Sequence, residues 1–377
     1  MNDGKRNEGS PAGERSTLEE LRRRGSLLRF GSHQAYRHLL QSVAIRTGLD
    51  LSQPSTFVIR VTDRCPLRCV HCTDWSADSA GELTTGQWID ILDDIARWPG
   101  RCHTILTGGE PLQRDDLDQL ARHASRRGLT CTVFTHGGNL GVARLARLVD
   151  AGVRCLRVSL DGIGETHSRI RGREKFWERT SRSIETLRRL RRERDLRYTV
   201  RLKHVIMAHN LTDTIEVARL ANQEGFHVFY QPIEQNYNTP EDPQWFLHND
   251  NWPKDTAQAA RNVRELIRLK REGWHIANSY AQLEAMIPYF ENPDAHRVAV
   301  MSHAAHEARR SCTALVHMQF QANGDVVACS GVPPIGNIKR TPIREIWKNR
   351  PRYWESGCCL EKRCSQAELA TLDGPSD

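Results

Sequence analysis

The 377-residue sequence predicts an α/β fold, a partial (β/α)6 barrel related to the TIM barrel, followed by a small C-terminal domain that contains cysteines. From Thr56 to Gln231, short apolar runs rich in β-branched residues alternate with segments of helical periodicity. Gly128, Gly152 and Gly225 each follow an expected helix end, where a left-handed residue is favoured. Such alternation is typical of parallel strands covered by helices. The polar motifs follow the strands, which is where barrels of this kind carry their chemistry.

The barrel elements come in a regular order along the chain. Phe57–Thr62 is a short apolar run with β-branched residues, which favours a strand. Thr85–Arg97 repeats its apolar residues at helical spacing, which favours a helix. The remaining expected strands are His103–Thr107, Thr130–Thr135, Val153–Leu160, Thr199–Met207 and His227–Gln231. The remaining expected helices are one marked by Leu117, Leu120, Ala121 and Ala124, and the segments Ala143–Ala151, Phe176–Glu193 and Asp213–Glu224.

Other segments flank the barrel, which we place at residues 51–235. Residues 1–50 are expected to form an N-terminal extension, first polar and disordered and then helical from Ser16, where Ser16-Thr17-Leu18-Glu19 has the form of a capping box. Residues 236–305 interrupt the alternation and are expected to form a connector with a helix near Thr256–Arg271. Residues 306–366 are expected to form the C-terminal domain, and residues 367–377 a tail.

The composition restricts the partners of the chain. It contains no run of about 18 apolar residues, so we expect no membrane partner. The net charge is +8, from 54 basic and 46 acidic residues, which permits anionic partners without requiring them. The arginine-rich stretch 188–194 lies on a helical segment and is expected to be a solvated outer face. Without aromatic interleaving or a recognisable binding module, we expect no nucleic-acid partner.

The stretch Cys65-Pro66-Leu67-Arg68-Cys69-Val70-His71-Cys72 places three thiols at C-x₃-C-x₂-C spacing directly after an expected strand. Three thiolates can hold three irons of a [4Fe–4S] cube, which is normally held by four, and leave the last iron open. Zinc would need a fourth ligand, and His71 lies between two of the cysteines, where it cannot easily supply one. A disulfide framework fits poorly with 11 cysteines and no signal peptide. Thiolates on iron require a reducing compartment, so a cytoplasmic protein is expected.

A second motif, Thr107-Gly108-Gly109-Glu110-Pro111, follows the second expected strand. Two glycines let the backbone approach a ligand closely, and the carboxylate of Glu110 could hold an ammonium group. Taken alone, the motif is equally compatible with an ordinary turn between strand and helix. Combined with the C-x₃-C-x₂-C motif one unit upstream, it resembles the radical S-adenosylmethionine (SAM) superfamily, over roughly residues 55–235.

This resemblance implies a set of roles. A [4Fe–4S] cluster would bind SAM at its open iron, and its ligands would be Cys65, Cys69 and Cys72. The methionine part of SAM would contact Gly108, Gly109 and Glu110, and His71 would lie next to its adenine.

The end of the fourth expected strand carries a third motif, Ser159-Leu160-Asp161-Gly162, with His167 and Arg171 downstream. It is similar to a run found in radical SAM enzymes. By this resemblance, Ser159 and Asp161 lie near the SAM ribose or the substrate, and Arg171 contacts the SAM carboxylate. The alternative is a turn at the strand end with an exposed ion pair. His136, where relatives often carry Asn, is either a substrate or ribose contact or a solvated loop residue.

A second set of cysteines follows the barrel. Asn323-Gly324-Asp325 is a hairpin signal between two short strand patterns, and a helical segment, Ile343–Asn349, lies further along. The layout resembles the SPASM or shortened twitch domains of radical SAM enzymes and implies one auxiliary [4Fe–4S] cluster. A structural Cys₄ zinc site is the alternative. The implied cluster ligands are Cys312, Cys329, Cys359 and Cys364, with Cys358 as the alternative to Cys359.

The resemblance implies an enzyme that reductively cleaves SAM to a 5′-deoxyadenosyl radical, which removes a hydrogen atom from the substrate. No catalytic residue is assigned, although the spare Cys358 or Cys359 could return a hydrogen atom. The outcome is oxidation if the auxiliary cluster accepts an electron, or epimerisation if a thiol returns a hydrogen atom, in natural-product biosynthesis. We expect a small carbohydrate-like substrate, with a ribosomal peptide or protein as the alternative. The partners are that substrate and an electron donor such as flavodoxin or ferredoxin, and a non-catalytic iron–sulfur electron carrier is the remaining alternative.

Overall fold

The computed structural model describes residues 35–36, 39–40, 42–44, 46–138, 140–193, 199–235, 242, 244–293, 316–328 and 333–351. The chain divides into the units Met1–Gln53 and Pro54–Asp377. In the first unit, residues 35–36, 39–40, 42–44 and 46–47 are helical, as expected for the end of the N-terminal extension. The capping box at Ser16 lies outside the described residues.

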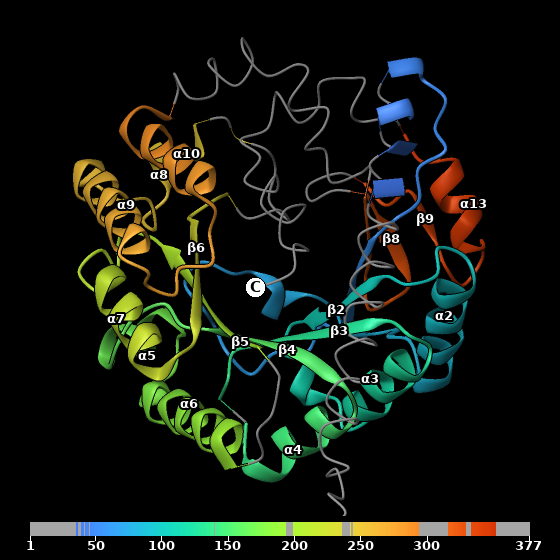
Figure 1. The fold of residues 1–377 in the computed structure, drawn as a ribbon, viewed down its shortest axis with the longest axis horizontal. Coiled ribbons are helices and arrows are strands. Elements are labelled where there is room, and N and C mark those ends of the chain that lie inside the picture. The colour runs from blue at the N-terminus through green and yellow to red at the C-terminus, as the bar shows by residue number, and fades with distance from the viewer. Residues whose placement is uncertain are drawn as a thin grey trace, which may run out of the picture. The chain divides into compact units, whose positions relative to one another are not determined.

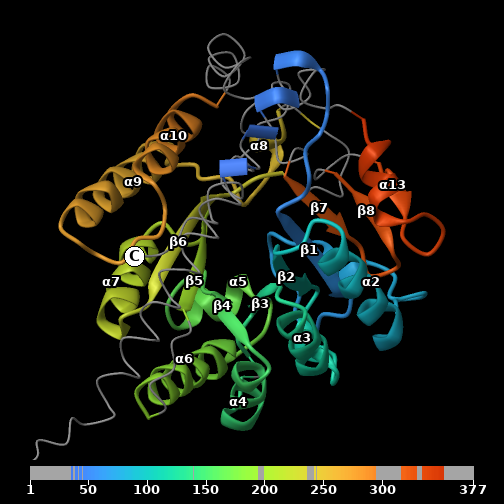
Figure 2. The same ribbon diagram turned by 45° about the vertical axis from the view of Figure 1, so that its right-hand side comes forward.

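The second unit is built on one sheet (Figures 1 and 2). Its strand order is β6-β5-β4-β3-β2-β1-β7-β8-β9 in the described part of the chain, and β1 to β6 pair with their sequence neighbours in parallel. This is the succession predicted for a partial (β/α)6 barrel. The strands are β1 (Thr56–Thr62), β2 (His103–Gly108), β3 (Thr130–Thr135), β4 (Val153–Ser159), β5 (Thr199–Ile206) and β6 (His227–Pro232).

Helices cover the outer face of these strands (Figure 2). They are α2 (Thr85–Arg97), α3 (Leu117–Arg126), α4 (Val142–Asp150), α5 (Glu165–Ile170), α6 (Phe176–Glu193) and α7 (Thr214–Glu224). The short α5 was not predicted, because one and a half turns carry too little periodicity to be recognised. Among the described residues, no helix is long and apolar enough to span a membrane.

The register of the parallel strands separates an apolar outer row from a polar inner row. Ile59, Leu106, Val133, Leu156 and Val200 are paired across β1 to β5, and all are buried in the core beneath the helices. Because side chains alternate across a strand, the next residue in each strand faces the interior of the barrel. That inner row is Phe134, Arg157, Arg201 and His227 across β3 to β6, and a second inner row is Ser159, Lys203 and Phe229.

The connector contains more helix than the sequence predicted. The expected helix is α9 (Thr256–Arg271), and it is accompanied by α8 (Trp245–His248) and α10 (Tyr280–Glu291). A proline such as Pro288 is unfavourable inside a helix, so the sequence of α10 does not predict one. Ser279 and Gln282 nevertheless form a capping box at its start. Trp245 and Trp252 pack at 5.6 Å in an aromatic cluster with Phe246, Tyr289 and Phe290. These aromatic residues therefore serve packing.

The C-terminal hairpin extends the barrel sheet. Strand β7 (His317–Phe320) pairs with β1 in parallel, and β8 (Asp325–Val327) and β9 (Gly336–Asn337) continue the sheet antiparallel. The predicted turn is present, with Gly324 in the left-handed region at φ 92°. The helix predicted at Ile343–Asn349 is α13 (Ile343–Lys348).

Candidate functional site

The cysteine loop follows β1 and is held by segments that are distant in the sequence. The main-chain N–H of Val70 donates to the carbonyl of Ile170 at 3.0 Å, and Asn251 Nδ2 donates to the carbonyl of Val70 at 3.1 Å. Gly172 has φ 63°, and a Cβ placed there would lie 2.1 Å from the carbonyl oxygen of Arg68. The end of α5 is therefore packed directly against the loop that carries the thiols.

The three thiols of this loop have the chemistry of cluster ligands. Cys65, Cys69 and Cys72 are partly exposed and free of disulfide bonds. Burial raises the pKa of Cys65 to about 11 and of Cys72 to about 12, and the proximity of Cys69 adds to both shifts. Within the described ranges, no three His, Cys, Asp or Glu side chains converge on a single point as one metal ion would require. A cubane cluster binds each thiolate through a separate iron, so this spacing suits a cluster better than a single zinc ion.

Gly108 and Gly109 allow two chain segments to touch. Gly108 has φ 138°, and a Cβ there would lie 2.0 Å from the carbonyl oxygen of Thr62. A Cβ on Gly109 would lie 2.5 Å from the carbonyl oxygen of Asp63, and its N–H donates to Thr62 at 2.8 Å. The glycine pair thus fixes the path of the chain into Cys65. From the sequence, the two glycines were expected to let the backbone approach a ligand, whereas here they let two backbone segments touch.

Glu110 is fully buried, and its carboxylate is bound by its own chain. Oε1 accepts hydrogen bonds from the N–H of Leu112 at 3.0 Å and the hydroxyl of Thr135 at 2.8 Å, while Oε2 accepts from the N–H of His136 at 2.8 Å. These bonds join the turn after β2 to the end of β3. An ammonium group would have to share this carboxylate with three existing donors.

His136 is buried, so the prediction of a solvated loop histidine is wrong. Its Nδ1 accepts from the N–H of Gly138 at 2.9 Å, and its Nε2 lies 3.2 Å from Glu110 Oε2. Burial lowers the pKa of His136, and Glu110 offsets this shift only in part. The ring is neutral at pH 7 and packs edge-on against Phe176 at 5.2 Å.

Asp161 and Arg171 form a buried ion pair, which overturns the alternative of an exposed pair at the strand end. Arg171 Nη2 lies 2.5 Å from Asp161 Oδ2, and Arg171 Nη1 lies 3.7 Å from Cys69 Sγ as a donor. Asp161 Oδ1 accepts from the N–H of Val205 at 2.9 Å. Burial raises the pKa of Asp161, but the charge of Arg171 and the proximity of His71 outweigh it, so that the carboxyl stays ionised.

His71 completes this group. Its Nε2 lies 3.9 Å from Asp161 Oδ2, and burial lowers its pKa to about 4. Its Nδ1 and the Nε of Arg171 are buried without a hydrogen-bond partner among the described residues. Unpartnered buried polar atoms are rare and call for an explanation. A polar ligand bound beside the thiols would supply hydrogen-bond partners for both atoms.

His167 contacts the strand-four motif and holds it in place. Its Nδ1 accepts from the N–H of Asp161 at 3.2 Å, and its ring stacks on Phe176 at 5.8 Å. It is therefore a packing residue. Ser159 lies at the end of β4 on an inner row, beside Lys203 of β5.

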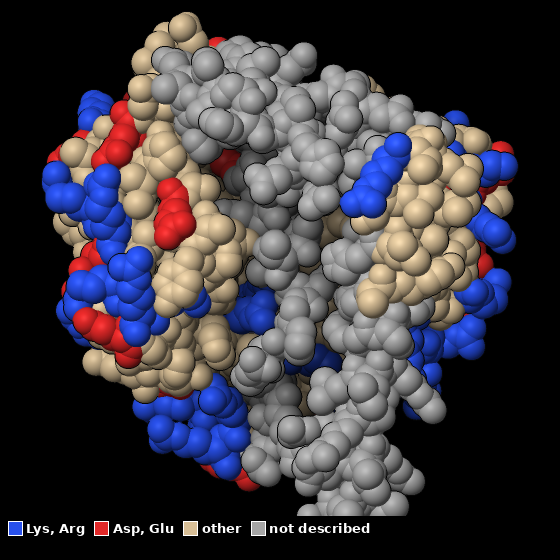
Figure 3. Space-filling view, turned by 45° about the horizontal axis from the view of Figure 1, so that its top comes forward, with Lys and Arg blue, Asp and Glu red and all other residues tan. Residues whose placement is uncertain are grey.

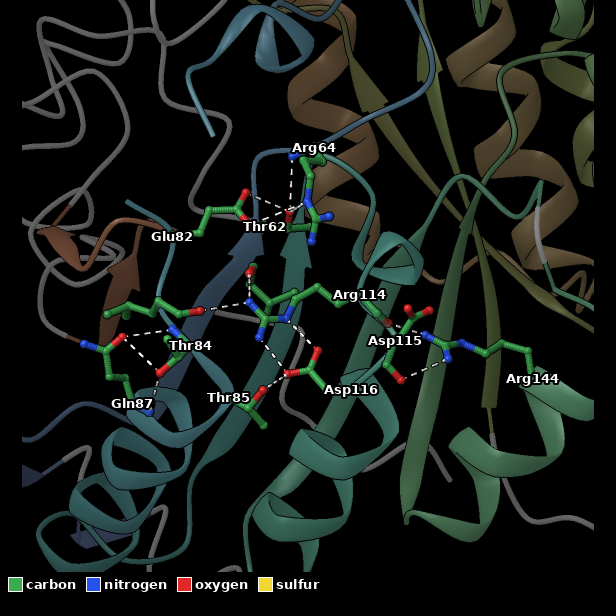
Figure 4. Close-up of polar contacts among 12 residues, drawn as sticks. Thr62, Arg64, Glu82, Thr84, Thr85, Gln87, Arg114, Asp115, Asp116 and Arg144 are labelled. Carbon is green, nitrogen blue, oxygen red and sulfur yellow. Dashed lines mark hydrogen bonds and ion pairs between the residues drawn. The ribbon is translucent and has the colours of Figure 1, made fainter. Parts of the chain in front are cut away.

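A buried network next to the site fixes the approach to the cysteine loop (Figure 4). Arg114 Nη1 donates to the carbonyls of Val61 at 2.9 Å and Leu83 at 3.0 Å, while Nε donates to Asp116 at 2.9 Å. The hydroxyl of Thr62 donates to Glu82 Oε1 at 2.8 Å. These residues were not predicted, because a single arginine after a turn shows nothing in the sequence about its distant hydrogen-bond partners.

The charged residues inside the barrel were not predicted either. Arg157, Arg201 and Lys203 occupy inner positions of β4 and β5, and Glu234 follows β6. Strand alternation could have located the basic residues, since each interrupts an apolar strand. The candidate auxiliary ligands Cys312, Cys329, Cys358, Cys359 and Cys364 lie outside the described residues.

Comparison with known families matches both parts of the chain. Residues 59–221 match the model of the radical SAM superfamily, and residues 312–368 match an iron-sulfur cluster-binding domain, SPASM. An AdoMet-dependent heme synthase of Methanosarcina barkeri is 30% identical over 310 residues, which cover 78% of this chain and 82% of that protein. A PqqA peptide cyclase of Rhodopseudomonas palustris is 35% identical over 46% of each chain.

Solved structures agree on the fold. Streptococcus suis SuiB bound to S-adenosylmethionine has a TM-score of 0.62 at 16% identity, over 94% of this chain and 83% of that chain. SAM and a [4Fe–4S] cluster that binds it are thus cofactors of this protein, together with auxiliary iron–sulfur binding in the C-terminal domain. The chain belongs to the radical SAM superfamily, as an enzyme with a SPASM domain.

Proposed function

We propose that this enzyme carries out radical modification of a tetrapyrrole that bears carboxylate side chains. The observation that carries the proposal is the similarity to the AdoMet-dependent heme synthase, which extends over 82% of that protein and so includes more than the common radical SAM region. A pre-heme d1 synthase of Dinoroseobacter shibae is 34% identical over 47% of this chain. An Fe-coproporphyrin III synthase of Methanosarcina barkeri is 28% identical over 54% of it.

The inner surface of the barrel supports an anionic substrate. Arg157 and Arg201 are paired in register on adjacent strands, and they carry the positive charge of the inner row, since burial lowers the pKa of His227 beside them on β6. Phe134, the fourth member of this row, stacks under the guanidinium of Arg157 at 4.6 Å. In the space-filling view of Figure 3, Lys or Arg side chains are visible in the recess near the centre of the face that it draws. Basic groups in a partly enclosed site attract carboxylates strongly, because solvent screening is weak there.

The cysteine loop and strand-four motif support the same reaction class. A SAM-loaded [4Fe–4S] cluster supplies reductive cleavage of the sulfonium, and Cys65, Cys69 and Cys72 would hold it. Gly108, Gly109 and Glu110 would border the methionine part of SAM, and His71 its adenine. Ser159 and Asp161 would lie near the SAM ribose or the substrate, and Arg171 would contact the SAM carboxylate. In the C-terminal domain, Cys312, Cys329, Cys364 and either Cys358 or Cys359 would hold the auxiliary cluster.

A peptide substrate is the second candidate. The similarity to PqqA peptide cyclases is 33–36% in identity, but it covers only 34–46% of those proteins. A similarity of this extent includes too little of those proteins to favour their substrate over a tetrapyrrole. None of these relatives is named for a carbohydrate, so the carbohydrate-like substrate expected from the sequence has no support here.

The experiment is anaerobic reconstitution with iron and sulfide, followed by incubation with SAM, dithionite and Fe-coproporphyrin III. We expect 5′-deoxyadenosine and a porphyrin product of altered mass, both abolished in Cys69→Ala. A peptide related to PqqA serves as the parallel probe. Turnover of the peptide alone would overturn the tetrapyrrole proposal. Absence of 5′-deoxyadenosine at full iron content would instead favour an electron carrier.

A further inference from the structure

We propose that Glu234 is a catalytic acid–base residue that exchanges a proton with the substrate at the C-terminal end of β6. No sequence motif marks this residue, and it belongs to neither the cysteine loop nor the strand-four motif. The inference deepens the proposed function, since it rests on a substrate that lies inside the barrel.

The backbone holds Glu234 at the end of the barrel where the cysteine loop lies. It follows β6 by two residues, and the residue between them, Ile233, is fixed on both sides. The N–H of Ile233 donates to the carbonyl of Ile206 at 2.9 Å, and its own carbonyl accepts from the hydroxyl of Tyr289 at 2.8 Å. Glu234 is therefore carried on a rigid strand end, as precise chemistry requires.

The neighbours of the Glu234 carboxyl come from the inner face of the sheet. Gln231, on β6, and Lys203, on β5, both lie close enough to the carboxyl to lower its pKa. Lys203 acts in the same way on His71 of the cysteine loop. The ammonium group of Lys203 thus lies within electrostatic reach of both Glu234 and the cysteine loop.

One oxygen of this carboxyl has no hydrogen-bond partner. Oε1 of Glu234 is shielded from solvent and receives no hydrogen bond from the described residues. The contrast with Glu110 is informative, because three donors of the chain bind the Glu110 carboxylate. Leaving a buried polar atom unpartnered destabilises the folded chain. A strand-end carboxyl kept in this state points to a partner that arrives with the substrate.

The protonation state of Glu234 suits proton exchange. Burial raises its pKa to about 7, although Lys203 and Gln231 act against the shift. A group with a pKa near the working pH can both accept and donate a proton. As a base, Oε1 forms a bond to the proton while the substrate X–H bond breaks and leaves its electron pair on X. As an acid, the same step runs in reverse, and no electron enters or leaves Glu234.

The test compares reconstituted wild-type enzyme with Glu234→Gln, which keeps the shape and removes the titration. Glu216→Gln is the matched control, because Glu216 is an exposed glutamate that pairs with Arg219 on the surface of α7. Infrared difference spectra over a pH series should show a protonated carboxyl band that titrates near pH 7. We expect the band in the wild type and in the control, and its loss in Glu234→Gln. Formation of 5′-deoxyadenosine without substrate should stay within about twofold, since Glu234 belongs to neither the cysteine loop nor the strand-four motif.

Turnover of Fe-coproporphyrin III should fall at least about 100-fold in Glu234→Gln and lose its pH dependence near neutrality. Unchanged turnover, the absence of the titrating band, or loss of substrate-free SAM cleavage would each overturn the role of Glu234. If the wild type converts neither the porphyrin nor the peptide, the proposed function fails. In that case the infrared band would still show whether Glu234 holds a proton that titrates near pH 7. Substrate-free SAM cleavage would show separately whether the variant affects the reaction of SAM.

Discussion

The guanidinium of Arg171 donates to the sulfur of Cys69 at 3.7 Å, although 102 residues separate them in the sequence. The same guanidinium is held at 2.5 Å by the buried carboxylate of Asp161. Asp161 therefore orients a positive charge toward Cys69, which we propose as a cluster ligand. Hydrogen bonds to the sulfurs are among the factors that set the reduction potential of iron–sulfur clusters.

Replacing Arg171 should lower the potential of the SAM-binding cluster. In Arg171→Gln the positive charge beside Cys69 is lost, so the reduced, more negative cluster is stabilised less. A potentiometric titration followed by electron paramagnetic resonance should show a shift to more negative values. Arg173→Gln is the control, because Arg173 is exposed in the same turn. Equal potentials in wild type and Arg171→Gln would rule out this influence.

Replacing Asp161 should destabilise the fold. Asp161→Asn leaves Arg171 buried without its counter-charge, and loss of one partner of a buried pair costs about 3–5 kcal/mol. Urea unfolding at pH 7 measures the free energy of unfolding. Asp94→Asn removes an exposed pair with Arg97 and should cost below about 1 kcal/mol. A similar small loss in both variants would show that the Arg171 charge is compensated by other groups.

Gly109→Ala should disrupt the approach to the cysteine loop. Its Cβ would lie 2.5 Å from the carbonyl oxygen of Asp63 and 2.6 Å from that of Arg64, two backbone atoms that cannot rotate away. We expect at least a severalfold loss of iron bound on reconstitution, measured per folded protein. The control is Gly86→Ala in α2, where a Cβ meets no atom within 4 Å. Normal iron binding in Gly109→Ala would show that the two segments can separate without cost.

The raised pKa of Glu234 predicts a pH-dependent stability difference. Between the ordinary glutamate pKa of 4.5 and about 7, the unfolded chain has released this proton while the folded chain keeps it. Wild-type stability should therefore fall relative to Glu234→Gln as the pH rises through this range, by about 3 kcal/mol. Melting temperatures of both proteins from pH 4 to pH 8 test the sign. Parallel curves would mean that Glu234 ionises at its ordinary pH.

Cys312→Ala tests the ligand set of the C-terminal domain. If Cys312 binds an auxiliary cluster, the variant should lose about one cluster's worth of iron and retain part of its SAM cleavage, since the first cluster has its own cysteines. Iron analysis and 5′-deoxyadenosine assays report the two effects separately. An unchanged iron content would assign a different ligand to these thiols.

Most of the barrel could be predicted because its signals are local. Buried parallel strands such as Val153–Ser159 are short apolar runs, and amphipathic helices such as Thr85–Arg97 repeat every three or four residues. The helix Tyr280–Glu291 was missed because Pro288 contradicts its pattern. The parallel pairing of β7 with β1 was also missed, since no local signal records a contact between segments about 260 residues apart.

The sequence alone located the thiol motif and the glycine pair, because both are short runs of fixed residue types. Only the folded chain showed that the glycines let two chain segments touch, that Arg171 faces Cys69, and that Glu110 is bound by its own chain. It also showed that one oxygen of Glu234 has no hydrogen-bond partner among the described residues. Charges and hydrogen bonds act over distances in space, and residues adjacent at this site come from strands and loops far apart in the chain. Their partners are therefore decided by packing.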